Sequence, residues 1–339
     1  MTKQSGTRTA RSQAAACLAA WTGTGKPVQG FIDTLIHDSG LSQEDRQLAV
    51  MLVMGTLRRQ GSLDWLLCRF SSTSLHKMKP LTLAALRIGA LQLCVLERVP
   101  DAAAVNETVA ALKLLRQPPW LLGFVNGILR NIARQKDSLP RFADLAPELD
   151  HPAWLAERWR RNLGEERARD ICRINGTEPQ LCLNSLRMDR QELASLLAAQ
   201  GIRSIPGAYG PQSLLLPDWR GSVTALPGFA EGLFQVQDQA AQLACALLGP
   251  FKAGGRYLDG CAGLGGKTCA LAALLPEGSA LTAVEPDERR LRLLGENLQQ
   301  QQARASVFSG DLQAFAATAP QPFDGVLIDA PCSGTGVIR

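Results

Sequence analysis

The chain has 339 residues, 46% of them hydrophobic and 20% charged, with a net charge of +5; this composition excludes a wholly disordered or fibrous protein and predicts two or three domains. The nine cysteines form no Cys-x-x-Cys pair and only three histidines are present, so we predict no metal site and a reducing, cytoplasmic location. No apolar run reaches the ~18 residues of a membrane-crossing helix, so no membrane partner is expected.

Residues 1–140 are predicted to be entirely helical. Leu83, Leu86, Ala90 and Leu93 recur at the spacing of a buried helix face, and no alternating strand pattern competes with it. This segment holds 17 Lys and Arg against 9 Asp and Glu, whereas the rest of the chain holds 19 against 22. The excess positive charge indicates either a polyanionic partner bound to the helical part or a solvated basic surface.

A small α+β domain is predicted over residues 151–232. Its pattern begins with a helix over 154–174, followed by a strand over 181–184. A second helix over 190–200 then leads to a strand over 214–216. The order helix, strand, helix, strand favours a compact α+β unit between the helical part and the rest of the chain.

The remaining segment, residues 233–339, alternates strands with helices. This order is typical of the parallel, doubly wound sheet of a Rossmann-like α/β domain. The predicted strands are 256–258, 280–284, 306–308 and 324–328, and the predicted helices are 238–248, one that includes 271–275, and 287–300.

A glycine-rich segment, residues 259–268, directly follows the first of these strands and reads Asp-Gly-Cys-Ala-Gly-Leu-Gly-Gly-Lys-Thr. Glycines allow a tight turn and a close approach of a ligand to the backbone. A phosphate-binding loop needs glycine where Cys261 stands, and the dinucleotide fingerprint needs glycine where Thr268 stands. Both nucleotide signatures fail, which leaves a methyl-donor loop or a purely structural turn.

Acidic residues follow the next three predicted strands. Glu285 is placed to accept both hydroxyls of a ribose, although a surface acid before a proline is the alternative. Asp311 is suited to an adenine amino group or a nearby amide, and Asp329 begins the segment Asp-Ala-Pro-Cys-Ser-Gly. Open α/β sheets bind ligands at the carboxyl ends of their strands. An acid for a ribose without a phosphate cradle fits S-adenosylmethionine, whose sulfonium needs no anion site.

With these motifs, residues 233–339 resemble the Sun/Fmu-type RNA cytosine-5 methyltransferases. Their donor loop reads Asp-x-Cys-Ala-Ala-Pro-Gly-Gly-Lys-Thr and their fourth-strand motif reads Asp-Ala-Pro-Cys-Ser; here Gly263 and Leu264 replace Ala-Pro. Residues 237–240 are also similar to the family's lead-in helix. The resemblance implies a class I methyltransferase domain that holds S-adenosylmethionine through Cys261, Ala262, Gly263, Leu264, Gly265, Gly266, Lys267, Glu285, Asp311 and Asp329.

The two earlier segments carry resemblances of their own. Val99-Pro100, Asn106-Glu107 and residues 124–130 are similar to the NusB-type helical RNA-binding domain, and residues 151–232 resemble the RRM-like pre-catalytic domain of the same methyltransferases. Only the bacterial 16S rRNA subgroup joins these parts. The resemblance therefore implies a monomer that modifies 16S rRNA at position 967 in standard rRNA numbering. Its substrate is expected to be either naked 16S rRNA or a small-subunit assembly intermediate. Phosphate contacts are then expected from Arg8, Arg11, Arg58 and Arg59, with a solvated surface as the alternative for each.

The chemistry requires a cysteine, because carbon 5 of cytosine becomes nucleophilic only after a thiolate adds to carbon 6. From the residues alone, Cys332 is the expected nucleophile, since it follows Pro331 at a strand end beside the donor loop. The family resemblance instead assigns the attack to a cysteine in a later Thr-Cys-Ser motif, gives Cys332 a role in product release and lets Asp329 hold the cytosine. Cys261 is expected to pack rather than react, and core positions are expected for Cys17, Cys68, Cys94, Cys172, Cys182, Cys245 and Cys269.

The 339 residues contain no Thr-Cys-Ser, and the predicted strands are fewer than the family's sheet contains. We therefore expect a methyltransferase domain that is incomplete at its C-terminal end, with an open sheet edge prone to association. Two other hypotheses stay open at this stage. One is a non-catalytic rRNA-binding factor with a vestigial donor domain, and the weaker one is a phosphate-loop nucleotide hydrolase.

Overall fold

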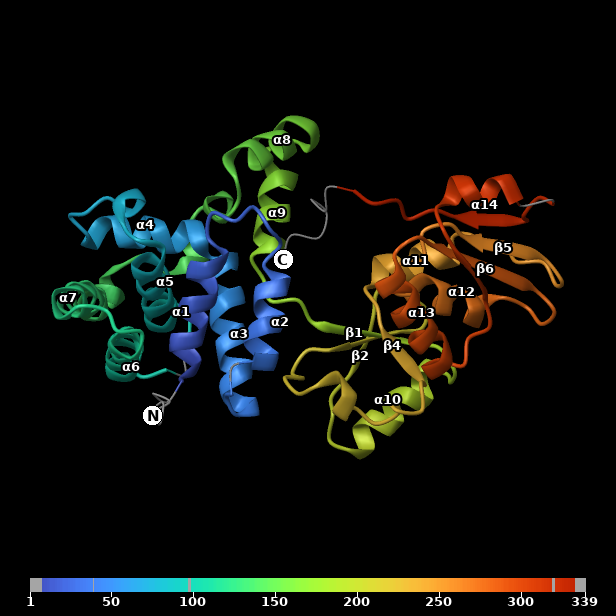
Figure 1. The fold of residues 1–339 in the computed structure, drawn as a ribbon, viewed down its shortest axis with the longest axis horizontal. Helices are drawn as coiled ribbons and strands as arrows, with labels where there is room; N and C mark the ends of the chain where they lie inside the picture. Colours follow the sequence, from blue (N-terminus) through green and yellow to red (C-terminus); the bar gives the residue numbers. More distant parts are fainter. Residues whose placement is uncertain (1–7, 39, 97–98, 319–320, 333–339) are drawn as a thin grey trace, which may run out of the picture. The chain divides into compact units, whose positions relative to one another are not determined.

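The computed structural model describes residues 8–38, 40–96, 99–318 and 321–332. It divides into two compact units, one formed by the chain up to Glu178 and the other by the chain from Pro179 onwards (Figure 1). Within the described residues, no helix combines the length and the hydrophobicity needed to cross a membrane.

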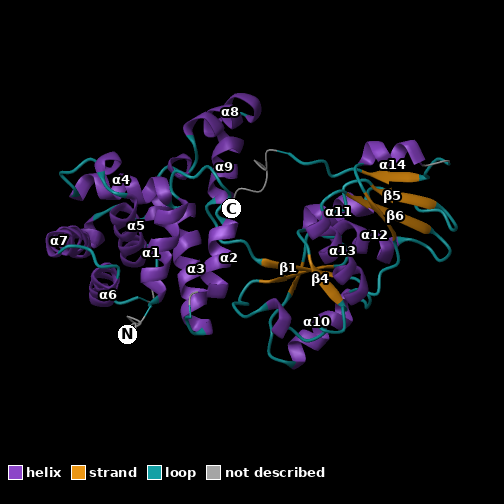
Figure 2. Ribbon diagram, viewed as in Figure 1, coloured by secondary structure: helices purple, strands orange, loops and turns teal. Residues whose placement is uncertain are grey.

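The described residues of the first unit form helices and no strands, which confirms the helical class predicted for residues 1–140 (Figure 2). Local sequence signals start several of its helices: Thr9 and Ser12 form a capping box, the Ser42 hydroxyl accepts the Asp45 N–H, and prolines open two helices. The helices are α1 (Ala10–Trp21), α2 (Gln29–Asp38), α3 (Gln43–Arg58), α4 (Gln60–Phe70), α5 (Pro80–Cys94), α6 (Asp101–Leu114), α7 (Pro119–Gln135), α8 (Ala153–Leu163) and α9 (Glu165–Asn175).

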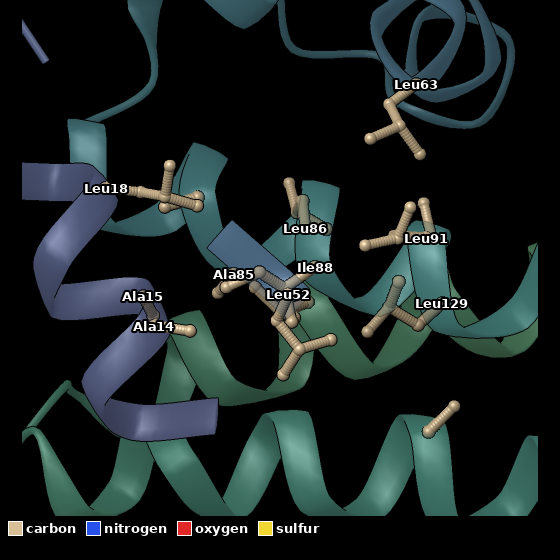
Figure 3. Close-up of a cluster of buried hydrophobic side chains, with 14 of the residues drawn as sticks. Ala14, Ala15, Leu18, Leu52, Leu63, Ala85, Leu86, Ile88, Leu91 and Leu129 are labelled. Carbon is tan, nitrogen blue, oxygen red and sulfur yellow. The ribbon is translucent and has the colours of Figure 1, made fainter. Parts of the chain in front are cut away.

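Helix α5 is the centre of this unit. It contacts α1, α3, α4, α6 and α7, and its Leu86, Ile88 and Leu91 lie in one cluster with residues of the surrounding helices (Figure 3). A Cβ at Gly89 would lie 2.5 Å from the Leu129 Cδ1 atom, so the glycine allows α5 and α7 to pack at short range. Most of the core residues are leucine and alanine, with isoleucine and valine among them, in agreement with the aromatic content of only 5%.

Within the first unit, the segment from residue 136 to 175 is attached to the junction of helices α3 and α4 through Asp150. Its carboxylate accepts the Ser62 N–H at 2.7 Å and the Ser62 hydroxyl at 2.8 Å, and it pairs with Arg59 at 3.4 Å. Helices α8 and α9 pack on this turn, so the contacts group them with the helical unit. The predicted domain boundary at residue 151 differs from this division and stays a prediction. The single helix expected over 154–174 is broken at Gly164, whose φ is +84°.

The second unit begins with a small antiparallel sheet. Its strand order is β2 (Ile205–Pro206), β3 (Ser213–Leu216), β1 (Leu181–Ser185) and β4 (Phe234–Val236), and helix α10 (Arg190–Ala199) packs on it. Leu183, Leu193 and Phe234 belong to its core. This confirms the α+β class of the middle segment, but β4 lies beyond residue 232, the predicted end of that domain.

A second, parallel sheet follows with the order β7 (Ser306–Ser309), β6 (Ala280–Glu285), β5 (Arg256–Asp259) and β8 (Gly325–Leu327). Helices α11 (Gln239–Ala246), α12 (Gly266–Leu274), α13 (Glu288–Gln300) and α14 (Leu312–Thr318) alternate with its strands. The four predicted strands are confirmed. The chain moves outward from β5 through β6 to β7 and returns to the other side of β5 with β8, which creates a topological switch point between β5 and β8.

Candidate functional site

The predicted donor motifs meet at the carboxyl ends of these parallel strands. The sheet register aligns Asp259 at the end of β5 with Ala283 in β6 and with Leu327 in β8. Glu285 and Asp329 therefore each come two residues beyond the level of Asp259, on either side of the glycine-rich loop. This arrangement places the loop at the switch point, where open α/β sheets bind ligands.

Backbone conformation explains two of the loop glycines. Gly263 and Gly265 have φ values of +58° and +88°, a left-handed conformation that side chains rarely adopt. At Gly265, a Cβ would also lie 2.6 Å from the Leu294 Cδ1 atom, whereas at Gly263 it would meet nothing within 4 Å. The loop is fixed to the sheet by the Ala262 N–H, which donates to the Val284 carbonyl at 3.0 Å.

The buried side chain of Asp259 holds the loop by hydrogen bonds. Its side chain is fully buried, and it accepts the Thr268 hydroxyl at 2.7 Å and the Cys261 N–H at 3.4 Å. Burial raises the pKa of this carboxyl, while the Thr268 hydrogen bond opposes the shift. Asp259 and Thr268 thus join the two ends of the loop. Both residues belong to the sequence motif, but the sequence alone did not indicate this supporting role.

Glu285 lies directly against the loop, where the ribose acid was predicted. It is only 3% exposed; its Oε2 accepts the Gly263 N–H at 2.9 Å and its Oε1 accepts the Asp287 N–H at 2.9 Å. A carboxylate offers about four lone-pair sites, so two hydroxyl donors can still be accepted. The buried position argues against the alternative of a surface acid.

The fourth-strand motif reaches the loop through an ion pair. The Lys267 Nζ lies 2.6 Å from the Asp329 Oδ2, and this contact joins the start of α12 to the end of β8. Cys332 is exposed three residues further along the chain. Asp311 follows β7 but turns to its own helix, where its carboxylate accepts the Ala314 N–H at 2.7 Å. The structure therefore brings Lys267, Glu285 and Asp329 to the loop, whereas among the described residues Asp311 makes no hydrogen bond or ion pair with it.

The thiol of Cys261 is poorly suited to attack. Burial raises its pKa, and the nearby carboxylates of Asp259, Asp329 and Glu285 raise it further. This agrees with the packing role expected for it. The buried thiols of Cys245 and Cys269 behind the loop have pKa values raised to about 11 by burial.

One cysteine expectation is wrong. Cys68 was expected in the core, but it is exposed near the end of α4, because the buried face of that helix is formed by Leu63, Leu66 and Leu67. Cys94 is half-buried, and the remaining core expectations are confirmed for Cys17, Cys172, Cys182, Cys245 and Cys269.

A group of side-chain amides supports the loop from the small sheet. Gln235 and Gln237 donate to the Gly266 carbonyl at 2.7 and 3.1 Å, and Asn184 donates to the Gln237 Oε1 at 2.8 Å. Gln237 is buried, so its bond with Asn184 lies out of water, whereas the bond from Gln235 to Gly266 is exposed. The sequence signal was present, since Gln237 opens the lead-in motif, but only the structure shows what the side chain contacts.

The arginines expected to contact RNA do not form one cluster. Arg11 is half-buried and donates to the Gln92 Oε1 at 2.7 Å, and Arg59 pairs with Asp150. Burial lowers the pKa of Arg11 and of Arg58. Arg8 is exposed at the start of the first described segment. RNA contact by these four residues stays a prediction, with Arg11 and Arg59 also serving the fold.

These features define a methyltransferase-type α/β domain preceded by a helical unit, and three family models match the chain accordingly. The NusB family matches residues 8–134, the ferredoxin-like domain of RsmF/B-type methyltransferases matches 151–220, and 16S rRNA methyltransferase RsmB/F matches 246–339.

Curated relatives extend the match over most of the chain. Ribosomal RNA small subunit methyltransferase B of Proteus mirabilis is 34% identical, covering 97% of this chain and 77% of the relative. The probable enzyme of the same name from Bacillus subtilis is 32% identical, covering 91% of this chain and 70% of the relative. A solved methyltransferase homolog from Pyrococcus horikoshii is 27% identical over 59% of this chain and 66% of its own, with a TM-score of 0.51. The chain belongs to the RsmB/F family of 16S rRNA methyltransferases.

Proposed function

We propose that this chain methylates carbon 5 of a cytosine in 16S rRNA, at position 967 as the family resemblance implies, with S-adenosylmethionine as donor and a cysteine adduct at carbon 6. The observation that carries the proposal is the meeting of the glycine-rich loop, Glu285 and the Lys267–Asp329 pair at the switch point of the sheet. The substrate is naked 16S rRNA or a small-subunit assembly intermediate, and the protein acts as a cytoplasmic monomer without a metal.

The residues of the loop fit this donor. Glu285 is a buried acceptor for ribose hydroxyls, and Gly263 and Gly266 have open space where a Cβ would stand, so a ligand can approach the backbone. Asp311 is proposed to accept the adenine amino group. When bound, S-adenosylmethionine supplies a methyl group on a positively charged sulfur. No phosphate is present in it, which agrees with the failure of both phosphate-binding signatures.

The chain's own residues then hold and activate the cytosine. The base must leave its stack to enter the site, and Asp329, kept in place by Lys267, is proposed to hold its edge. A cysteine thiolate forms a bond to carbon 6, carbon 5 gains the methyl group and loses its proton, and the carbon–sulfur bond then breaks. Cys332 is proposed either to make this bond or to assist its breakage; the raised pKa of Cys261 makes that residue the poorer candidate.

Trapping with modified RNA tests this assignment. In 16S rRNA transcribed with 5-fluorocytidine, carbon 5 has no proton to lose, so an adduct at carbon 6 persists and is detected by mass spectrometry. If Cys332 attacks, Cys332→Ser abolishes the adduct, while Cys68→Ser, the other exposed cysteine of the described residues, keeps it. If Cys332 serves release, another cysteine of the chain must attack, so Cys332→Ser keeps the 5-fluorocytidine adduct and also accumulates an adduct with ordinary cytosine. Donor binding with neither adduct nor transfer would contradict the proposal and favour a non-catalytic rRNA-binding factor.

A further inference from the structure

Helix α7 presents an exposed face that the methyltransferase site does not use. Trp120, Gly123, Gly127, Arg130 and Arg134 are all exposed, and at about 100° per residue they fall within an arc of about 80°. The opposite side of α7 is the buried one. Trp120 is 72% exposed, more than the other large hydrophobic side chains described in the helical unit. α7 contacts α4, α5 and α6 and lies at one side of this unit (Figure 1).

This face carries an excess of positive charge. Residues 108–136 contain five Lys and Arg and no Asp or Glu, and of these five Lys136 pairs with Asp101 at 2.6 Å. Lys113, Arg116, Arg130 and Arg134 are exposed, and none makes an ion pair with a carboxylate of the described residues. By contrast, the α9 arginine Arg173 pairs with its neighbour Asp170. The cations around α7 are therefore available to an anionic partner.

The two glycines have no role in the fold that the structure shows. A Cβ at Gly123 or Gly127 would meet nothing within 4 Å, and neither residue has a positive φ. Gly89 in α5 differs, because its Cβ would collide with Leu129. Glycine inside a helix lowers helix stability relative to other residues. At Gly123 and Gly127 its effect is to leave the helix surface flat between the indole of Trp120 and the guanidinium groups of Arg130 and Arg134.

We propose that this α7 face is a docking surface for single-stranded RNA. A base stacks on Trp120, phosphates bind Arg130 and Arg134, and the sugar–phosphate backbone lies over Gly123 and Gly127. Arg134 donates to the Asn131 side chain but has no carboxylate partner among the described residues. An aromatic platform beside cations without carboxylate partners is the combination that single-stranded nucleic acids recognise. At ~1.5 Å per residue, Trp120 and Arg134 lie ~21 Å apart along α7, which leaves room for several nucleotides. The proposal rests on the proposed rRNA substrate and adds a second contact point, on the helical unit.

Titration of the full chain with a fluorescent single-stranded oligonucleotide of 16S rRNA sequence tests the aromatic and charged parts. Trp120→Ala removes one stacking platform, so we expect an affinity loss of about tenfold. Arg130→Ala with Arg134→Ala removes two phosphate contacts, so the slope of log affinity against log salt falls by about 1.4. Unchanged affinity and salt slope in both variants would overturn the proposal. It would also be overturned if the variants bind RNA normally but no longer bind an acidic protein, because the face would then dock a protein.

The glycines provide a test that loss of folding cannot mimic. Gly123→Gln with Gly127→Gln places good helix formers on the face, so we expect a higher melting temperature together with weaker RNA binding. The matched control is Gly295→Gln on the exposed side of α13, where a Cβ also meets nothing within 4 Å; it raises the melting temperature and leaves RNA affinity unchanged. An α7 variant that is more stable and binds RNA normally would contradict the proposal.

Donor binding and methyl transfer by the unmodified chain separate this proposal from the proposed function. If the chain binds S-adenosylmethionine and methylates rRNA while the α7 variants bind RNA normally, only the α7 surface is rejected. If the chain binds neither donor nor RNA, both are rejected.

Discussion

At the scale of single residues, the site depends on buried polar groups that hold the loop rather than touch a ligand. Asp259 is fully buried, and the Thr268 hydroxyl donates to it at 2.7 Å. A buried carboxylate without partners is strongly destabilising, so this hydrogen bond maintains both the fold and the loop geometry.

Thr268→Val removes that donor while keeping the shape of the side chain. We expect the free energy of unfolding at neutral pH to fall by about 1–3 kcal/mol, because one Asp259 oxygen loses its partner. Thr56→Val is the matched control: the Thr56 hydroxyl is buried with no partner among the described residues, so its replacement is expected to be neutral or stabilising. Urea unfolding measures both variants, and equal losses would contradict the role of the hydrogen bond.

The pH dependence of that loss follows from the direction of the pKa shift. Burial raises the pKa of Asp259, so the folded protein binds this proton more tightly than the unfolded chain, and stability falls as pH rises through that pKa. Thr268 opposes the shift, so Thr268→Val raises the pKa further and extends the fall to higher pH. The difference from the unmodified protein is expected to be smallest in acid, where Asp259 is protonated in both; a difference independent of pH would contradict this.

At the scale of elements, β4 and α12 are joined by the amides of Gln235 and Gln237, which share the Gly266 carbonyl as acceptor. The small sheet therefore contributes directly to the position of the donor loop. The individual strands and helices were predictable from hydrophobic spacing, but this contact was not, because strand pattern carries no information on which side chains meet across two sheets.

Because Gln235 and Gln237 share one acceptor, we expect their substitutions to have non-additive effects on S-adenosylmethionine affinity. Gln235→Met leaves the Gly266 carbonyl with one side-chain donor, so it should lower S-adenosylmethionine affinity only slightly. Gln237→Met should lower it more, because the buried Asn184 amide also loses its acceptor. The double variant leaves none, and we expect affinity to fall by about tenfold, more than the product of the single effects. Isothermal titration calorimetry measures the three variants, with melting temperatures recorded to exclude unfolding. Strict additivity would show that the two amides act independently.

At the scale of the whole molecule, sequence established the order of the three fold types and the position of the donor motifs. Glu285, Lys267 and Asp329 lie at the loop because a strand that ends in glycines or an acid directs them to the same edge of a parallel sheet; their contact with a donor stays a prediction. The association of α8 and α9 was not predictable, because it depends on the long-range contacts of Asp150 with Ser62 and Arg59. Local pattern specifies elements, whereas such buried polar contacts decide which elements group together.

That grouping can be measured with fragments ending at Glu178 and at Asp150. Leu155, Ala168 and Cys172 are buried, and the His151 ring packs edge-on against Trp159 with centroids 5.5 Å apart. We expect the fragment ending at Glu178 to unfold cooperatively and at a higher temperature than the shorter one, because the latter loses the packing of α8 and α9 on the turn at residues 147–150. Circular dichroism measures both transitions. Equal melting temperatures would show instead that α8 and α9 belong, as the predicted boundary at residue 151 has it, with the domain that follows.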